Sequence, residues 1–359
     1  MIIDIHCHVG GNGKDIENVD NDVYFDPYDN QKLVTNVLYY MLFNEYRKMG
    51  AVVEDDNSMT ADNYFRFIYE LLKNTEEIDA IVLLAMDACY NPKNGELMKK
   101  ETDLFVSNKY LYNKINELNL RFENENIDKR FFFGASVNPN REDWESEMNY
   151  VLTQTDAVLF KLIPSAHNVK LNDSRYVEFY RQLAINNKPL LCHVGPEYSF
   201  PGALDRKALD NFRNLVKPLE NGVTVIAAHC AAPVFPIIDC NTIKEFSDFM
   251  YDANRDKIRL YGDTSALSLS FRLPFISQIL NEFDDDWLVH GSDFPIPIDG
   301  GPHLPIVTHD VSFSEYDKIM NCDNPFDRDV LIKRAHGFSD FILTNTAKIL
   351  NHPAIGEVN

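Results

Sequence analysis

Two histidines, His6 and His8, stand two positions apart in the segment DIHCH near the start of the chain. If this segment is a strand, the alternation of side chains points both imidazoles to one face and Cys7 to the other. Imidazole nitrogens are ligands that divalent transition metals favour. By itself the pair is a weak signal, because most such pairs in strands are ordinary hydrogen-bonded or surface residues.

Three more ionisable side chains stand at the ends of later apolar segments. His193 lies near the end of PLLCHVG, His229 near the end of TVIAAHC, and Asp293 near the end of WLVHGSDFP. One buried imidazole or carboxylate alone is usually a hydrogen-bonded core residue. Several of them at the ends of neighbouring strands would converge around one axis, where a divalent cation would satisfy them together. The set therefore indicates metal-assisted chemistry.

The elements that would position these residues follow a repeating pattern. From residue 78 onward, short β-rich apolar segments alternate with amphipathic segments of helical period, which is typical of βα units around a parallel sheet. The predicted strands are Ile2–Val9, Ala80–Cys89, Arg130–Val137, Ala157–Pro164, Pro189–Gly195, Thr224–Cys230, Arg259–Thr264 and Trp287–Phe294. The predicted helices between them are Leu104–Asn124, Asp143–Leu152, Ser174–Ile185, Leu204–Leu219, Thr242–Ala253 and Ser270–Asn281. Eight strands at this spacing favour an α/β fold of the closed (β/α)8 TIM-barrel type over an open sheet.

Two segments exceed what a barrel needs. Residues 10–77 contain two predicted helices, one around the very apolar Val37–Phe43 and one over Ala61–Asn74 behind a Thr60 cap. This insertion either packs on the barrel or forms a lid or a homodimer interface. Residues 295–324 are rich in Pro and Gly and predict a long loop at the mouth of the site. We interpret the 359 residues as one domain with insertions.

Composition excludes several kinds of partner. A net charge of -21 argues against binding to nucleic acid or to an anionic membrane. The N-terminal segment has no signal-peptide pattern, and no uncharged segment approaches the length of a membrane span. The 6 cysteines are scattered without CxxC spacing, as in proteins with reduced thiols. We expect a cytoplasmic protein without disulfides that acts on a small molecule.

Taken in order, the motifs resemble those of the amidohydrolase superfamily, in its amidohydrolase-related branch, also called amidohydrolase 2. They are DIHCH, FKLIP, LLCHVG, IAAHC, HGSDFP and the closing FILTNTAKIL (Phe341–Leu350), which looks like the terminal helix of that branch. The resemblance spans nearly the whole chain. Singly the motifs are weak, but as an ordered set they are specific.

The resemblance implies a metal site with His6, His8, His193 and Asp293 as ligands. His229 would be either a further ligand or a catalytic imidazole beside the substrate. The ion would be Zn²⁺ first of all, with Mn²⁺ or another divalent ion as alternatives, and it would activate a water molecule. Asp293 would act as the general base for that water.

Lys161, in FKLIP, makes the number of metal ions an open question. In binuclear members a lysine at this point is carboxylated and bridges two metals, with His229 as a second-metal ligand. In the single-metal branch the lysine is unmodified, and we favour that interpretation with one ion. Weaker candidates for contact with substrate or for orienting a ligand are Asp87, Asn138, Glu197 and Asp263. We interpret His290 as structural, and we expect the loop residues His167, His303 and His309 at the surface.

The chemistry that these residues favour is metal-dependent hydrolysis of an amide, lactone or ester-like bond in a small molecule. The alternative is a lyase: the same branch includes non-oxidative decarboxylases of aromatic or unsaturated carboxylic acids, which use the same ligand types. A third, non-catalytic interpretation is a barrel that keeps a metal for stability. The complete set of ligand and base residues argues against it.

Overall fold

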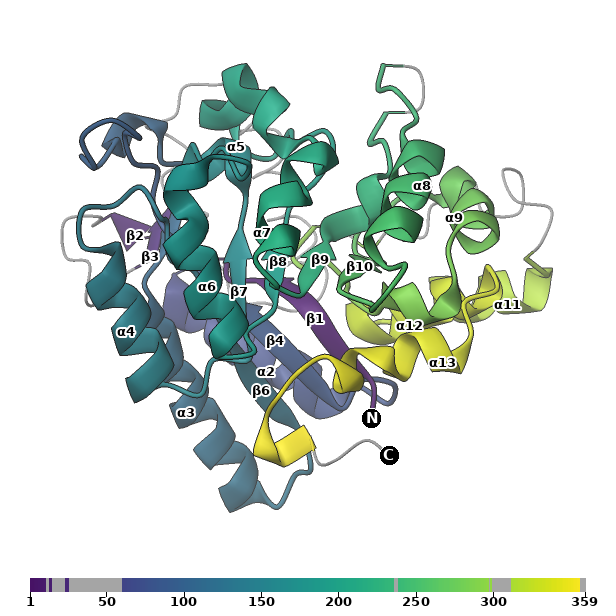
Figure 1. Ribbon diagram of the computed structural model, residues 1–359. Coiled ribbons are helices and arrows are strands. Elements are labelled where there is room, and N and C mark those ends of the chain that lie inside the picture. Colours follow the sequence, from purple (N-terminus) through teal and green to yellow (C-terminus); the bar gives the residue numbers. More distant parts are fainter. Residues whose placement is uncertain are drawn as a thin grey trace.

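A computed structural model describes residues 1–10, 13–14, 23–25, 60–235, 238–296, 298 and 311–355. Val37–Phe43, His303 and His309 lie outside the described residues. In the described part, eight parallel strands form one sheet in the order β1-β4-β6-β7-β8-β9-β10-β11 (Figure 1). Their bounds are β1 Ile3–His8, β4 Ala80–Leu84, β6 Arg130–Ala135, β7 Leu159–Leu162, β8 Leu190–Cys192, β9 Val225–Ala227, β10 Leu260–Asp263 and β11 Leu288–Val289. All eight predicted strands are confirmed, each within its predicted limits.

The two outer strands of this order, β1 and β11, also meet. The backbone N–H of Ile5 donates to the carbonyl of His290 (3.1 Å), and the N–H of Asp293 donates to the carbonyl of His6 (2.8 Å). A further parallel bridge joins Cys7 and Phe294. The sheet therefore closes on itself, as the barrel prediction requires.

Alternate residues of the strands pack on opposite faces of the sheet. In β4, Ile81 and Leu83 belong to the apolar layer under the helices, whereas Val82 and Leu84 belong to a second apolar cluster with Val289 of β11. This second cluster gathers residues from all around the sheet and fills the barrel interior. The period-2 pattern thus decides which side chains can reach the barrel axis.

A local irregularity in β1 turns its histidines toward the axis. Ile3 and Ile5 belong to the interior cluster, whereas Cys7 packs in the layer under the helices. Strict alternation from Ile3 would place Cys7 inside, but the register with β4 shifts between Asp4 and Cys7, as in a β-bulge. Because of this shift, the side chains of His6 and His8 face the interior.

Helices cover the outside of the sheet (Figure 1). Their bounds are α2 Ala61–Asn74, α3 Asn108–Glu125, α4 Trp144–Gln154, α5 Pro164–His167, α6 Val177–Ile185, α7 Val216–Glu220, α8 Ile243–Ala253, α9 Ile276–Glu282, α11 Phe313–Met320, α12 Pro325–Ala335 and α13 Asp340–Thr344. The predicted helix Ala61–Asn74 is confirmed with its cap, because the Thr60 hydroxyl accepts from the N–H of Asn63.

Several helix predictions need correction. Residues Leu104–Val106 form β5, which pairs with β3 (Val23–Phe25) in a small antiparallel sheet with β2 (Gly13–Lys14), and α3 begins only after its Ser107 cap. The predicted helix Leu204–Leu219 is instead two 3₁₀ segments followed by α7. Asn211 interrupts it, because its side chain accepts from the N–H of Arg213.

The C-terminal part is more helical than we expected. The predicted loop 295–324 contains α11, which begins at a capping box of Ser312 and Glu315. The predicted terminal helix Phe341–Leu350 is only the short α13 followed by a 3₁₀ segment, Asn345–Lys348. Within the described part of the chain, no helix is long and apolar enough to span a bilayer.

Candidate metal centre

Three ligand atoms from the two ends of the chain converge where β1 meets the segment after β11. Nε2 of His6 lies 3.1 Å from Nε2 of His8 and 3.2 Å from Oδ1 of Asp293, and the same oxygen lies 3.5 Å from Nε2 of His8. Ligands bound at about 2.1 Å to one ion stand roughly 3 to 3.5 Å apart. The spacing of these three atoms therefore fits a divalent metal.

The hydrogen-bonding roles of these atoms also fit a cation. Nδ1 of His6 lies 2.7 Å from Oδ2 of Asp263, and because a carboxylate only accepts, Nδ1 carries the hydrogen. The other ring nitrogen of His6, Nε2, faces Asp293 and His8. Burial lowers the pKa of His8 to about 4, so the His8 ring is neutral at physiological pH. A divalent cation at this point would be a shared partner for all three atoms.

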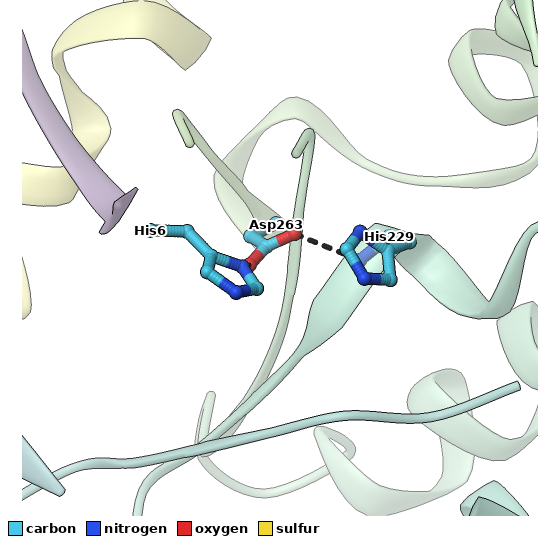
Figure 2. Close-up of side chains that lie close together, drawn as sticks. All are labelled: His6, His229 and Asp263. Carbon is cyan, nitrogen blue, oxygen red and sulfur yellow. Dashed lines mark hydrogen bonds and ion pairs between the residues drawn. The ribbon is translucent and has the colours of Figure 1, made fainter. Parts of the chain in front are cut away.

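Asp263, the last residue of β10, orients two of the histidines (Figure 2). Its Oδ2 accepts from the His6 ring, and its Oδ1 accepts from the backbone N–H groups of His229 (2.7 Å) and Ser265 (3.1 Å). Burial opposes ionisation of Asp263, but the charge and hydrogen bonds of His6, together with His229 and Ser265, hold its pKa well below its ordinary value. His6, His229 and Asp263 also form a group of close ligand atoms. Because the Asp263 oxygens are engaged by these hydrogen bonds, we interpret Asp263 as orienting the rings.

His229 lies beside the three ligand atoms. Its ring stacks on that of His6 with centroids 5.5 Å apart, and its Nε2 lies 3.9 Å from Oδ2 of Asp293. Nδ1 of His229 is 3.0 Å from the carbonyl of Ser265, an acceptor, so Nδ1 carries the hydrogen. The backbones of His229 (φ 59) and Asp293 (φ 68) are in the left-handed region, which non-glycine residues adopt only uncommonly.

The two oxygens of Asp293 therefore face different neighbours: Oδ1 faces His6 and His8, and Oδ2 faces His229. Burial opposes ionisation of Asp293. The charges of His6 and His229 and a hydrogen bond with His8 outweigh burial and hold the pKa of Asp293 well below its ordinary value. The carboxylate is thus ionised and able to accept a proton.

His193 follows β8 and lies beside His229, with ring centroids 5.1 Å apart. Its Nδ1 lies 3.4 Å from Oε2 of Glu197, whereas its buried Nε2 has no hydrogen-bond partner among the described residues. The groups of close ligand atoms found in those residues do not include His193. Of the four predicted ligands, three thus converge directly, and the fourth lies near them with an unsatisfied nitrogen.

Lys161 of β7 reaches the same place from across the barrel. It is fully buried, and its Nζ lies 2.8 Å from Nε2 of His6. Burial lowers the pKa of Lys161, although the charges of Asp293 and Asp263 oppose that shift. The amine of Lys161 therefore lies next to the converging ligand atoms, as its predicted place at the metal site requires.

The weaker sequence candidates have other partners. Oδ2 of Asp87 accepts from the N–H of Asn138 (2.7 Å) and pairs with Arg141 (3.2 Å), which indicates a structural role for both candidates. The expectation that His167 lies at the surface is wrong. His167 is buried on α5, and its Nδ1 accepts from the N–H of Ile163 (2.9 Å).

His290 points away from the ligand atoms, toward α12. Its Nδ1 lies 3.5 Å from Nζ of Lys333, which pairs with Asp329 and donates to the carbonyl of Gly291 (2.7 Å). Sequence reasoning missed this buried pair. An acid and a base four residues apart on a helix are usually an exposed pair, so the sequence held no signal for it.

The chain resembles known proteins in its sequence family and in its fold. The model of the family described as Amidohydrolase matches residues 111–320, more than half of the chain. No curated protein matches the sequence. An uncharacterised TIM-barrel protein from Bordetella bronchiseptica has a similar structure, with TM-score 0.50 and 14% identity over 93% of this chain and 99% of that one. A candidate metal-dependent hydrolase from Lactobacillus casei also scores 0.50, with 14% identity over 99% of this chain and 96% of the other. These similarities confirm the TIM-barrel fold.

Proposed function

Because this chain belongs to the amidohydrolase family, we propose that it is a metal-dependent hydrolase that cleaves an amide, lactone or ester-like bond of a small molecule. One observation carries the proposal: His6 and His8 from one end of the chain and Asp293 from the other bring three ligand atoms within 3.1 to 3.5 Å of one another. The three atoms lie near the carboxyl ends of the barrel strands, and this is the end of the barrel at which TIM-barrel enzymes do their chemistry.

The proposed ligands are His6, His8, His193 and Asp293, which would hold one divalent ion, Zn²⁺ first of all. The unsatisfied, buried Nε2 of His193 supports its inclusion. The position of Lys161 Nζ, 2.8 Å from His6 Nε2, is compatible with an unmodified amine and therefore with a single ion. When bound, such an ion supplies a Lewis acid that polarises the bond to be cleaved and acidifies water.

The chain's own residues would transfer protons and hold the reacting groups in place. With Oδ1 of Asp293 turned toward His6 and His8, its Oδ2 is the oxygen left to accept a proton from the attacking water. The Nδ1–H of His229 is fixed by the Ser265 carbonyl, so its Nε2 faces the reacting centre and can orient or protonate the departing group once it has gained a proton. Asp263 would keep the rings of His6 and His229 in these orientations.

The lyase alternative uses the same side chains, so the products distinguish the two reactions. Purified protein loaded with one divalent ion would be tested on amides, lactones, esters and aromatic or unsaturated carboxylic acids. We expect a new acid together with an amine or alcohol, and no turnover after chelation or in Asp293→Asn. Release of carbon dioxide would assign the lyase instead. Turnover that survives both chelation and Asp293→Asn would contradict the proposal.

The remaining sequence predictions are part of the same proposal. We propose one domain that acts on small molecules in the cytoplasm, with a candidate homodimer interface at Val37–Phe43. All 6 cysteines are free thiols and four of them are buried, which is compatible with a reducing compartment. Gel filtration with light scattering would measure the oligomeric state.

A further inference from the structure

Arg272 is a buried cation without a protein partner. It lies in the loop between β10 and α9 and is only 4% exposed. Its Nε is buried without a hydrogen-bond acceptor, and its guanidinium makes no hydrogen bond or ion pair with any residue in the described ranges. Proteins rarely bury an arginine unless it is paired, because an unpaired buried charge is costly. The missing partner is therefore an anion that does not belong to the described part of the chain.

The electrostatic neighbours of Arg272 place it beside the candidate metal centre. Its charge interacts with the carboxylates of Asp293, Glu197 and Asp263. Burial lowers the pKa of His193 and of His229, and the charge of Arg272 lowers both further. These residues lie at or just after the carboxyl ends of β8, β9, β10 and β11, so Arg272 stands at the same rim of the barrel.

The carboxylates at this rim are already engaged by other groups. Oε1 of Glu197 accepts from the N–H of Ser199 (2.5 Å), and its Oε2 lies 3.4 Å from the His193 ring. Asp263 accepts from His6 and His229. The side chain of Asp293 faces three histidines. The arginine is held near all three carboxylates yet paired with none, which leaves its donors available to a ligand.

We propose that Arg272 binds a carboxylate group of the substrate, so that the molecule turned over here is a carboxylic acid held by that group beside the reacting centre. The planar guanidinium offers parallel N–H donors that match the two oxygens of a carboxylate. The inference rests on the proposed function only in placing a substrate at this rim. The anion site itself depends on Arg272 and not on the reaction.

The test compares ligands that differ in charge but hardly in shape. Calorimetry measures the binding of each ligand to the whole protein, and acetate is compared with acetamide and benzoate with benzamide. Each ligand is tested on metal-loaded and on chelated protein. In the chelated protein we expect at least one of the carboxylates to bind at least tenfold more tightly than its amide. Arg272→Met should abolish that preference and leave amide binding unchanged, and Arg272→Lys should retain part of it. The matched control is Arg213→Met, which removes an exposed arginine paired with Glu245.

Each result is decisive. If neither carboxylate is preferred over its amide in the chelated protein, or if Arg272→Met binds carboxylates as the wild type does, the inference is overturned. Inorganic phosphate binding more tightly than either carboxylate would also overturn it. Because binding to chelated protein needs no turnover, failure of the proposed reaction and failure of this site are distinguishable. A melting temperature for Arg272→Met well below that of Arg213→Met would reveal a partner within the protein and contradict the premise.

Discussion

The Nδ1 of His6 donates to Oδ2 of Asp263 across 2.7 Å, and both side chains are completely buried. The other oxygen of Asp263 accepts from the backbone N–H of His229. One carboxylate at the end of β10 therefore fixes a ring on β1 and the turn after β9. The proposed ligand and the proposed catalytic imidazole are oriented by the same group, so a change there should affect both.

Asp263→Asn should weaken metal binding. The amide has one oxygen where the carboxylate has two, so it cannot accept from both the His6 ring and the His229 N–H. Loss of such an outer partner typically costs 10- to 100-fold in metal affinity. Competition with a chromophoric chelator would measure the change. Asp252→Asn, an exposed residue paired with Arg255, serves as the control and should bind metal as the wild type does. Equal affinities for both variants would contradict the role of Asp263.

Gly291→Ala should also disturb the site, through packing. A Cβ at this position would stand 2.9 Å from Cβ of His6, a stiff part of that side chain, so the ring must move. We expect a loss of about 1 to 3 kcal/mol in stability together with weaker metal binding. In the control Gly134→Ala, the new Cβ meets methyl groups of Leu84 and Leu159 instead. That variant should lose stability while keeping its metal affinity, and an unchanged affinity in Gly291→Ala would refute the packing argument.

Lys333→Met should destabilise the fold. Nζ of Lys333 pairs with Asp329 and donates to the carbonyl of Gly291, and both partners of the ion pair are fully buried. Removing the lysine leaves a buried carboxylate without its counter-ion, which typically costs about 3 to 5 kcal/mol. The double variant Asp329→Leu with Lys333→Met should recover much of the loss in urea unfolding. A single variant as stable as the wild type would show that the pair contributes nothing.

The stability of the protein should fall as pH rises because of Asp210. Burial raises the pKa of Asp210 to about 8. The Ser165 hydrogen bond and Arg206 oppose this rise, and Glu197 adds to it. Between the unfolded value of 3.8 and about 8, the folded protein therefore holds a proton that the unfolded chain releases, and raising pH favours unfolding.

Asp210→Asn should remove this pH-dependent contribution to stability, because the amide does not ionise. The asparagine side chain can still accept from the Ser165 N–H. Urea unfolding of both proteins at several values from about pH 5 to pH 8 would measure it. The stability gained by Asp210→Asn over the wild type should grow with pH, and a constant difference would refute the shift.

The sequence predicted the barrel because its signals are local: apolar strands of period 2 and helices with clear caps, such as Thr60 before α2. It also predicted that His6 and His8 share a face. The expectation that they face the interior is confirmed, but alternation alone does not explain it, because by the same alternation Ile3 and Ile5 also face the interior. The bulge between Asp4 and Cys7 that reconciles them depends on pairing with β4, which no local pattern encodes.

Other features escaped the sequence because they depend on distant partners. Leu104–Val106 looks like the start of a helix until β3 pairs with it. Arg272 falls within the predicted helix Ser270–Asn281, but α9 begins only at Ile276, and only the burial of Arg272 without a partner identifies it. Tertiary contacts decide both cases, and local propensity is a weak guide to them.

The central claim is that side chains from both ends of the chain bind one divalent ion. The most direct test measures the metal content and metal affinity of the purified wild type and of His8→Ala. His336→Ala, which removes an imidazole just after α12, is the control. We predict about one ion per chain in the wild type and control, and an affinity at least tenfold weaker in His8→Ala. Metal bound equally well by His8→Ala, or no metal bound by the wild type, would contradict the account.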